Sequence, residues 1–191
     1  MNNNDINIEG LVLVENFLNE TEENHLIEEV NKMPWLKELQ RRVQHYGFKY
    51  NYKSKSINKE DFIGKIPQFC DFVLKRIKDK NPMSQEPDQL IVNEYTPGQG
   101  ISPHIDSVEL FEDEIFTISL GSDITMNFTE ASDKTNIKSL ILKRRTIMIL
   151  RKDARFKWKH SIPQRIYDVI KGKKVKRDTR ISLTFRKVKQ N

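Results

Sequence analysis

Two residues that can bind a metal ion, His104 and Asp106, stand two positions apart in the stretch NEYTPGQGISPHID at residues 93–106. Alternate residues of an extended segment project to the same side, so this imidazole and this carboxylate can face one cavity. A reactive metal needs a third protein ligand. His160, in the β-like segment FKWKHSIP, is the candidate. We therefore expect these three residues to meet around one ion.

The chemistry of such a site depends on which metal it holds. Two neutral imidazoles and one carboxylate on one face of an octahedron leave three positions open, which suits non-haem Fe(II). A zinc hydrolase can use the same ligand types, so the residues alone leave the metal open. A His-x-Asp tripeptide also arises by chance beside a surface histidine, and the chain holds four histidines.

The C-terminal stretch RDTRISLTFRKV predicts a strand with one apolar and one polar face. Buried arginines are costly unless anions pair with them, and a dicarboxylate would supply such partners through bidentate contacts. Arg180 and Arg186 would lie about 20 Å apart on a straight strand. We expect Arg180 to hold the far carboxylate and Arg186 to lie near the metal. A solvated edge strand is the alternative. The predicted polar face comprises Arg180, Ser182, Thr184 and Arg186.

Asn93 and Tyr95 repeat this period of two just before the Pro-Gly turn. An amide and a phenol on one strand face can hydrogen-bond the same carboxylates. Taken alone, the pair would be read as buried polar groups that the backbone satisfies. Its position upstream of His104 makes it a candidate part of the same site.

Composition limits the possible classes of protein. The 191 residues, 37% hydrophobic, are enough for one sizeable domain. The start MNNNDINIEG lacks the features of a signal peptide, and no apolar run is long enough for a membrane helix. The chain has a single cysteine, Cys70, which we expect in the core. We expect an intracellular protein, cytoplasmic or nuclear, that is monomeric and does not engage membranes. The net charge of +6 suits a polyanionic partner or a solvated basic surface.

The elements that must position these residues indicate an α+β fold that is mostly β. The stretch GLVLVENFL predicts a strand, Asn19 and Glu22 have capping-box spacing before an amphipathic helix, and residues 67–79 predict a second helix. Residues 43–52 are strand-like, and short β segments dominate from Asp88 onward. We expect N-terminal helices to buttress one sheet of a two-sheet jelly roll.

Four segments together resemble the AlkB family of Fe(II)- and 2-oxoglutarate-dependent dioxygenases: NEYTPGQGISPHID, FEDEIFTISLGSDITMNF, KWKHSI and RISLTFRKV. The similarity covers about residues 10–189. The stretches RRVQHYGFKYNY and SLGSDITMNF look most like the AlkB domain of the animal homologue fused to a tRNA methyltransferase. The resemblance implies a double-stranded β-helix that uses Fe(II), 2-oxoglutarate and O2. It implies iron ligands at His104, Asp106 and His160, and cosubstrate contacts at Asn93, Tyr95, Arg180, Ser182 and Arg186.

The resemblance also divides the chain. It implies a single domain over residues 1–191, with a flexible start at 1–9, an N-terminal extension at 10–87 and a catalytic core at 88–189. Residues 41–55 correspond to a substrate lid, in which arginines would contact phosphate and aromatic rings would stack on an extruded base. The aromatic residues could instead belong to the core. The lid candidates are Arg41, Arg42, Tyr46, Phe48, Tyr50 and Tyr52.

By this resemblance the substrate is an alkylated or modified nucleobase, with RNA, including tRNA, favoured over DNA. The basic stretch 171–177 either contacts a nucleic-acid backbone or forms an exposed loop. One alternative is the same oxidative site acting on a protein side chain, and another is a binding module without catalysis. The chain has no room for the homologue's RNA-recognition and methyltransferase modules, and its tail KVKQN lacks the zinc-binding extension. A preference for a wobble uridine is therefore not assumed.

Overall fold

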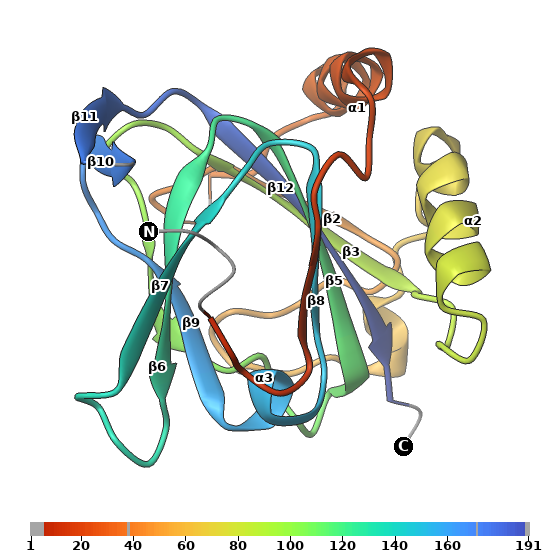
Figure 1. Cartoon of the computed structure of the whole chain (residues 1–191). Helices are drawn as coiled ribbons and strands as arrows, with labels where there is room; N and C mark the ends of the chain where they lie inside the picture. The colour runs from red at the N-terminus through yellow and green to blue at the C-terminus, as the bar shows by residue number, and fades with distance from the viewer. Residues whose placement is uncertain (1–5, 38, 171, 190–191) are drawn as a thin grey trace.

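Two antiparallel sheets face each other in the computed structural model, which describes residues 6–37, 39–170 and 172–189 (Figure 1). The larger sheet has the order β1-β8-β5-β12-β3-β2, and the smaller has the order β4-β9-β6-β7. The larger sheet consists of β1 (Leu11–Val14), β8 (Thr146–Leu150), β5 (Phe111–Gly121), β12 (Arg180–Val188), β3 (Gln89–Tyr95) and β2 (Val43–Tyr46). The smaller consists of β4 (Ile101–His104), β9 (Trp158–Ile162), β6 (Ile124–Glu130) and β7 (Ile137–Leu142).

The helices α1 (Glu20–Lys32) and α2 (Asp71–Lys80) cover the outer face of the larger sheet (Figure 1). The predicted capping box at Asn19 and Glu22 begins α1, and a 3-10 turn at Gln68–Cys70 precedes α2. A short helix, α3 (Lys152–Phe156), leads into β9. Cys70 is buried in the core, as predicted, and burial raises the pKa of its thiol to about 12. None of the helices in the described residues is long and apolar enough to cross a bilayer.

Alternation along β12 separates two hydrophobic cores. Ile181, Leu183 and Phe185 point toward the helices, where they pack with residues such as Leu26 and Val30. The opposite face of β12 points between the sheets, beside a second core that includes Tyr95, Phe128 and Trp158. β12 lies between β5 and β3, so its inner polar residues are flanked by strands on both sides. The mostly β prediction and the period-two reading of β12 are both confirmed.

The prediction of one strand over residues 43–52 is wrong beyond Tyr46. Gly47 adopts a φ of +73°, and a Cβ there would lie 1.7 Å from the Asp88 carbonyl oxygen. That close approach and left-handed turn end β2. The following residues form only isolated bridges, of which one joins Phe48 to Phe62. Tyr46 and Phe48 therefore do not share a strand face, although the sequence predicted that they would.

The basic stretch near residues 171–177 is part of a β-hairpin. β10 (Tyr167–Ile170) pairs with β11 (Lys173–Lys176), outside both larger sheets (Figure 1). Lys171 lies outside the described residues. Two ion pairs stabilise the hairpin, because Arg165 and Arg177 both contact the carboxylate of Asp168. An isolated two-stranded hairpin is only marginally stable, and the buried ion pair between Arg177 and Asp168 adds to its stability.

Candidate metal and cosubstrate site

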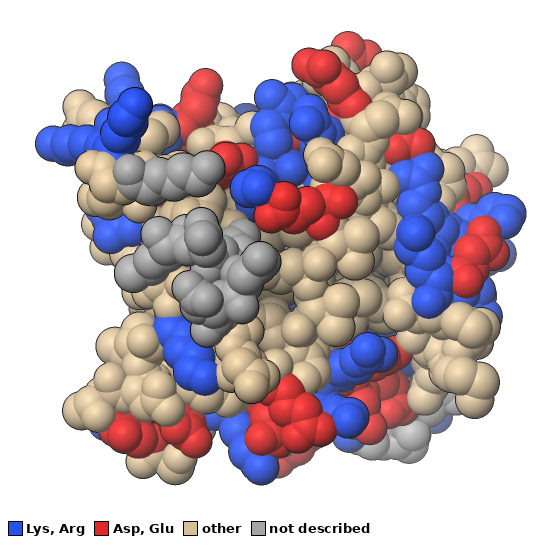
Figure 2. All heavy atoms as spheres, in the orientation of Figure 1, with Lys and Arg blue, Asp and Glu red and all other residues tan. Residues whose placement is uncertain are grey.

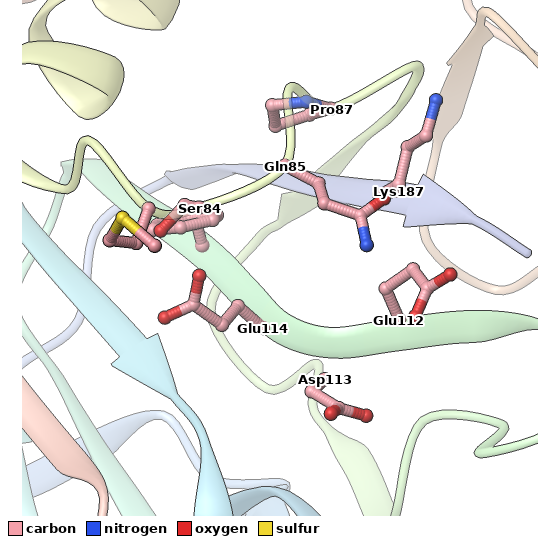
Figure 3. A pocket seen from close by; sticks show the side chains of 9 residues that line it. Ser84, Gln85, Pro87, Glu112, Asp113, Glu114 and Lys187 are labelled. Atoms are coloured by element: carbon pink, nitrogen blue, oxygen red, sulfur yellow. The ribbon is translucent and has the colours of Figure 1, made fainter.

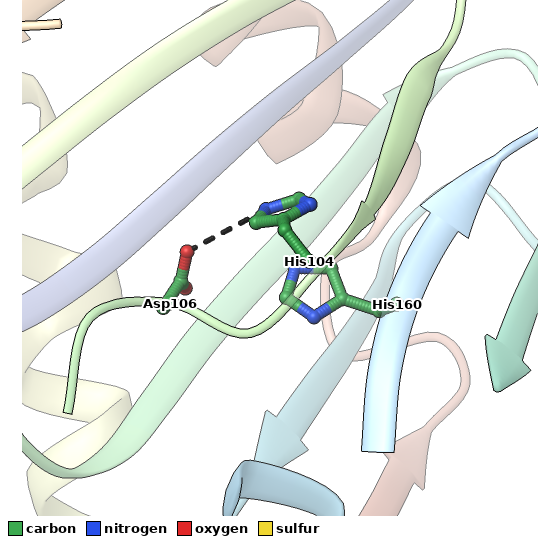
Figure 4. A group of neighbouring side chains, drawn as sticks. All are labelled: His104, Asp106 and His160. Atoms are coloured by element: carbon green, nitrogen blue, oxygen red, sulfur yellow. Dashed lines mark ion pairs between the residues drawn. The ribbon is translucent and has the colours of Figure 1, made fainter. Parts of the chain in front are cut away.

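His104, Asp106 and His160 lie together between the two sheets (Figure 4). His104 ends β4 and is the register partner of His160 on β9, so strand pairing itself brings the imidazoles together. Their ring centroids are 4.3 Å apart, and Nε2 of His104 is 3.7 Å from Oδ1 of Asp106. The three ligand atoms all lie within 4.8 Å of one another. This spacing allows one ion to be shared.

The protonation of these groups suits metal binding. Burial by itself would raise the pKa of Asp106, but Arg186 and the two imidazoles outweigh it and hold that pKa well below its usual range. Burial, together with the neighbouring His104, lowers the pKa of His160 to about 3. An ionised carboxylate and a neutral imidazole are the forms that bind metals. The donor set therefore fits a divalent cation.

Three outer contacts orient the ligands. Nδ1 of His104 lies 2.8 Å from the Ser102 carbonyl, which leaves Nε2 facing the cluster. Arg186 donates from Nε and Nη2 to the two oxygens of Asp106, each at 3.2 Å. Arg155, which is 2% exposed, donates to the backbone carbonyls of Asp106 at 2.6 Å and Ser107 at 2.9 Å. The sequence offered no signal for Ser102 or Arg155.

Arg180 lies at the other end of β12, and no carboxylate among the described residues forms an ion pair with it. It is 1% exposed, its Nε donates to Oγ of Ser119 at 2.8 Å, and its buried Nη2 has no hydrogen-bond partner among the described residues. Burial lowers its pKa to about 10. Its guanidinium lies 5.4 Å from the ring centroid of Tyr95, its register partner on β3. A buried guanidinium with a free donor fits an anionic group.

The remaining predicted cosubstrate residues lie between these two points. Asn93 on β3 is the register partner of Ser182 on β12, and both are buried. Oδ1 of Asn93 accepts a hydrogen bond from Nε of Arg41 at 2.7 Å. The inner surface thus carries the candidate metal-binding triad near Arg186 and, at Arg180, a guanidinium that forms no ion pair with any described residue. This is the arrangement that the sequence predicted for a diacid beside a metal.

The lid candidates separate into different environments. Phe48 and Tyr50 pack against the core between the sheets, and the phenol of Tyr50 lies within electrostatic reach of Arg186 and Asp106. Tyr46 packs instead against the helix-side core, in an edge contact with Phe69. Tyr46 and Phe48 thus pack on different sides of the larger sheet, and the predicted contact of Tyr46 with substrate stays a prediction that this packing does not favour.

The two lid arginines also diverge. Arg42 makes a bidentate contact with Glu94, at 2.7 and 2.6 Å, and lies over the ring of Trp35. Arg41 turns to the other side and reaches Asn93. The predicted phosphate contact at Arg42 stays a prediction; its guanidinium is held by the Glu94 carboxylate, and its side chain is 41% exposed. Tyr52 contacts His45 and Tyr50 edge-on.

Two hollows elsewhere on the described surface contain none of the triad residues. One, of about 200 Å³, is lined by the consecutive acidic residues Glu112, Asp113 and Glu114 together with Ser84 and Lys187 (Figure 3). Another, of about 280 Å³, lies between the β5–β6 turn and the β10–β11 hairpin. Neither brings a metal-ligating set together, so the chemistry is concentrated between the sheets.

Comparison with known proteins agrees with this geometry. Residues 10–186 match the model of the 2OG-Fe(II) oxygenase superfamily. The chain is 37% identical over 185 residues to uncharacterized protein L905 of Acanthamoeba polyphaga mimivirus, covering 95% of this chain and 86% of that protein. It is 34% identical over 206 residues to the tRNA (carboxymethyluridine(34)-5-O)-methyltransferase alkbh8 of Xenopus tropicalis. That match covers 95% of this chain but only 32% of the Xenopus protein.

A solved structure shares the fold. The structure of OsALKBH1 superposes with a TM-score of 0.72 at 17% identity, covering 96% of this chain and 100% of that one. The predicted double-stranded β-helix with helices on one sheet is confirmed by this match. At such low identity the match describes the fold and does not identify a substrate.

Proposed function

Because this chain belongs to the 2OG-Fe(II) oxygenase superfamily, and is thus a dioxygenase using Fe(II), 2-oxoglutarate and O2, we propose that it oxidises alkylated or modified nucleobases. RNA is the proposed polymer. One observation supports the site assignment above all. A His-Asp-His cluster lies near one end of β12, and at the other end lies a buried arginine that has no counter-ion in the described part of the chain.

His104, Asp106 and His160 would hold the iron. When bound, iron and 2-oxoglutarate supply the oxidising chemistry, in which O2 is consumed, 2-oxoglutarate loses CO2 to become succinate, and one oxygen atom enters a substrate C–H bond. The protein positions these groups and limits wasteful oxidation. If the oxidised carbon is attached to a ring nitrogen, the product separates into formaldehyde and the free base.

The chain's own residues carry out the binding and orientation. Arg180 would pair with the carboxylate of 2-oxoglutarate that lies far from the metal, supported by the phenol of Tyr95. Asn93 and Ser182, paired across β3 and β12, offer an amide and a hydroxyl between Arg180 and Arg186. Arg186 would keep the Asp106 carboxylate ionised and fixed in orientation. Arg186 would thus act on a metal ligand, with no direct contact to 2-oxoglutarate required.

Aromatic side chains on the side of the triad support a nucleobase as substrate. Phe48 and Phe62 lie with ring centroids 5.2 Å apart, and the side chain of Phe62 is 50% exposed although it is aromatic. Tyr50 lies deeper, beside Phe111 and near the triad. Exposed aromatic faces can stack on an extruded base. We propose that Phe48 and Tyr50 line the path of the base to the metal.

The β10–β11 hairpin would contact the phosphate backbone. Tyr167 pairs with Lys176 and Val169 with Lys174, so these four residues share one face, and all are exposed. Nζ of Lys174 lies 4.3 Å from the Tyr167 ring centroid. Figure 2 shows basic side chains gathered over this hairpin at the upper left. A face that combines cations with an aromatic ring is suited to single-stranded nucleic acid.

RNA is favoured by the similarity to a relative whose name specifies a tRNA methyltransferase, although this chain matches only a third of that protein.

The test is mass spectrometry of nucleosides from tRNA, mRNA and genomic DNA that are incubated with iron-loaded enzyme, 2-oxoglutarate and O2. The proposal predicts that a modified nucleoside is lost or hydroxylated in an RNA sample. Oxidation restricted to DNA would overturn the choice of polymer. Oxidation of a protein substrate with neither nucleic acid affected would overturn the substrate class.

A further inference from the structure

Arg41 and Arg180 both approach the ring of Tyr95. The guanidinium of Arg41 lies 5.7 Å from the ring centroid, and that of Arg180 lies 5.4 Å from it. Arg41 also donates from Nε to Oδ1 of Asn93 at 2.7 Å. Resting on the proposed function, we propose that Arg41 is a positioning residue of the cosubstrate site, which orients the Asn93 amide for 2-oxoglutarate.

The orientation follows from the chemistry of the amide. An asparagine side chain has one carbonyl acceptor and one NH2 group with two donors, and a carboxylate only accepts hydrogen bonds. Since Arg41 has only donors, it can occupy only the carbonyl end of Asn93. The NH2 end of the Asn93 amide is then left to donate to an acceptor such as a carboxylate of 2-oxoglutarate. Without Arg41 the amide could rotate and present its oxygen to a carboxylate, which would repel it.

Backbone and side-chain contacts keep Arg41 in this position. The amide of Glu94 donates to the Arg42 carbonyl at 3.0 Å, and the Arg42 side chain grips the carboxylate of Glu94. Nε2 of Gln99 donates to the Gln40 carbonyl at 2.9 Å. Residues 40–42 are therefore joined to the end of β3 and the turn after it, on either side of Arg41.

This placement replaces the predicted role of Arg41 as a phosphate contact. Arg42 points outward to Glu94 and Trp35, whereas Arg41 points inward to Asn93 and Tyr95. A second cation near Arg180 also increases the positive charge that a diacid meets.

The experiment measures equilibrium binding of 2-oxoglutarate to Mn(II)-loaded protein by calorimetry, which does not depend on turnover. Wild type is compared with Arg41→Met, Asn93→Ala, the double variant and Arg41→Lys. Arg151→Met is the matched control, because it removes the same charge from a half-exposed arginine that pairs with Glu114. Thermal unfolding of each metal-free variant checks that it folds.

We expect Arg41→Met to weaken 2-oxoglutarate binding about tenfold, the range of one charge-assisted hydrogen bond. Arg41→Lys should recover part of this loss, and Arg151→Met should bind as wild type does. Because Arg41 acts through Asn93, the double variant should bind 2-oxoglutarate only slightly less tightly than whichever single variant binds it less tightly. Wild-type affinity in folded Arg41→Met, or losses that add in the double variant, would overturn the inference. Wild-type protein that binds no 2-oxoglutarate would instead overturn the proposed function.

Discussion

The two oxygens of Asp106 are each held at 3.2 Å by a different nitrogen of Arg186. The same carboxylate faces His104 and His160, so one side chain is shared between a buried guanidinium and the candidate metal position. Arg186 is therefore positioned to control the charge of a metal ligand. The role predicted for it from sequence, a direct contact with the cosubstrate, remains a prediction.

Replacing Arg186 with Met should make metal binding sensitive to pH. Only the two imidazoles would then oppose the effect of burial, so the pKa of Asp106 should rise and protons would compete with the ion. We expect Mn(II) affinity to fall about tenfold at pH 6 and less at pH 8, with Arg186→Lys intermediate. Calorimetric titration at both pH values measures this. Equal losses at both values would argue against the mechanism.

Replacing Arg180 with Met should change binding and stability in opposite directions. A buried guanidinium with no counter-ion in the described structure is costly in the ligand-free protein, so an apolar side chain of similar length should raise the unfolding temperature by a few degrees. Affinity for 2-oxoglutarate should fall at least tenfold, because the charge partner is lost. Differential scanning calorimetry with and without 2-oxoglutarate tests both. A variant that 2-oxoglutarate stabilises as strongly as wild type would show that Arg180 is not its partner.

The period-two pattern of β12 could be read from sequence because the face toward the helices is apolar and the face between the sheets carries polar side chains. The meeting of His104 with His160 could be inferred only as a hypothesis, since strand register is not visible in sequence. The structure supplies that register through the pairing of β4 with β9. Arg155 left no signal, because its partners are backbone carbonyls that any residue carries.

The lid was harder to predict for two physical reasons. Gly47 changes the phase of the chain, so aromatic residues that alternate in sequence do not share a face. Arg41 and Arg42 form one basic pair in sequence, but their side chains lie on opposite sides, toward Asn93 and Glu94. Such separation depends on the register with β3, which composition does not contain.

Acid should weaken the metal-free fold through His160. Its pKa falls from 6.5 to about 3 on folding, so between these values the unfolded chain binds more protons than the folded one. Stability should therefore decline as pH drops from about 6.5 toward 3. His160→Gln cannot take up this proton, so its urea midpoint should change less over pH 7 to 4. The same pH slope in both proteins would show that His160 is not buried in neutral form.

Charge reversal on the hairpin should affect polymer binding without changing the chemistry. Lys174→Glu with Lys176→Glu removes two cations from one exposed face, so RNA binding should weaken and its salt dependence should flatten. Turnover of a modified mononucleoside should be unchanged. Lys134→Glu, in the exposed β6–β7 turn, is the control. Filter binding at several salt concentrations measures the effect, and an unaltered salt slope would exclude the hairpin from the interface.

The proposed path of the base can be tested with two tyrosines that were both predicted from sequence to contact substrate. Tyr50→Ala should reduce kcat/KM for an oligonucleotide by about tenfold or more, because it removes a ring near the triad. Tyr46→Phe should leave kcat/KM unchanged, since its ring packs on the helix side. Steady-state kinetics compares them. Equal effects of the two substitutions would contradict the assignment of Tyr50 to the base path.

The most direct test is an anaerobic crystal structure of the protein with Mn(II) and 2-oxoglutarate, in which anomalous scattering locates the ion. The account predicts one ion bound by His104, Asp106 and His160, with the far carboxylate of 2-oxoglutarate against the guanidinium of Arg180. An ion bound elsewhere, or a diacid that leaves Arg180 without an anionic partner, would contradict it.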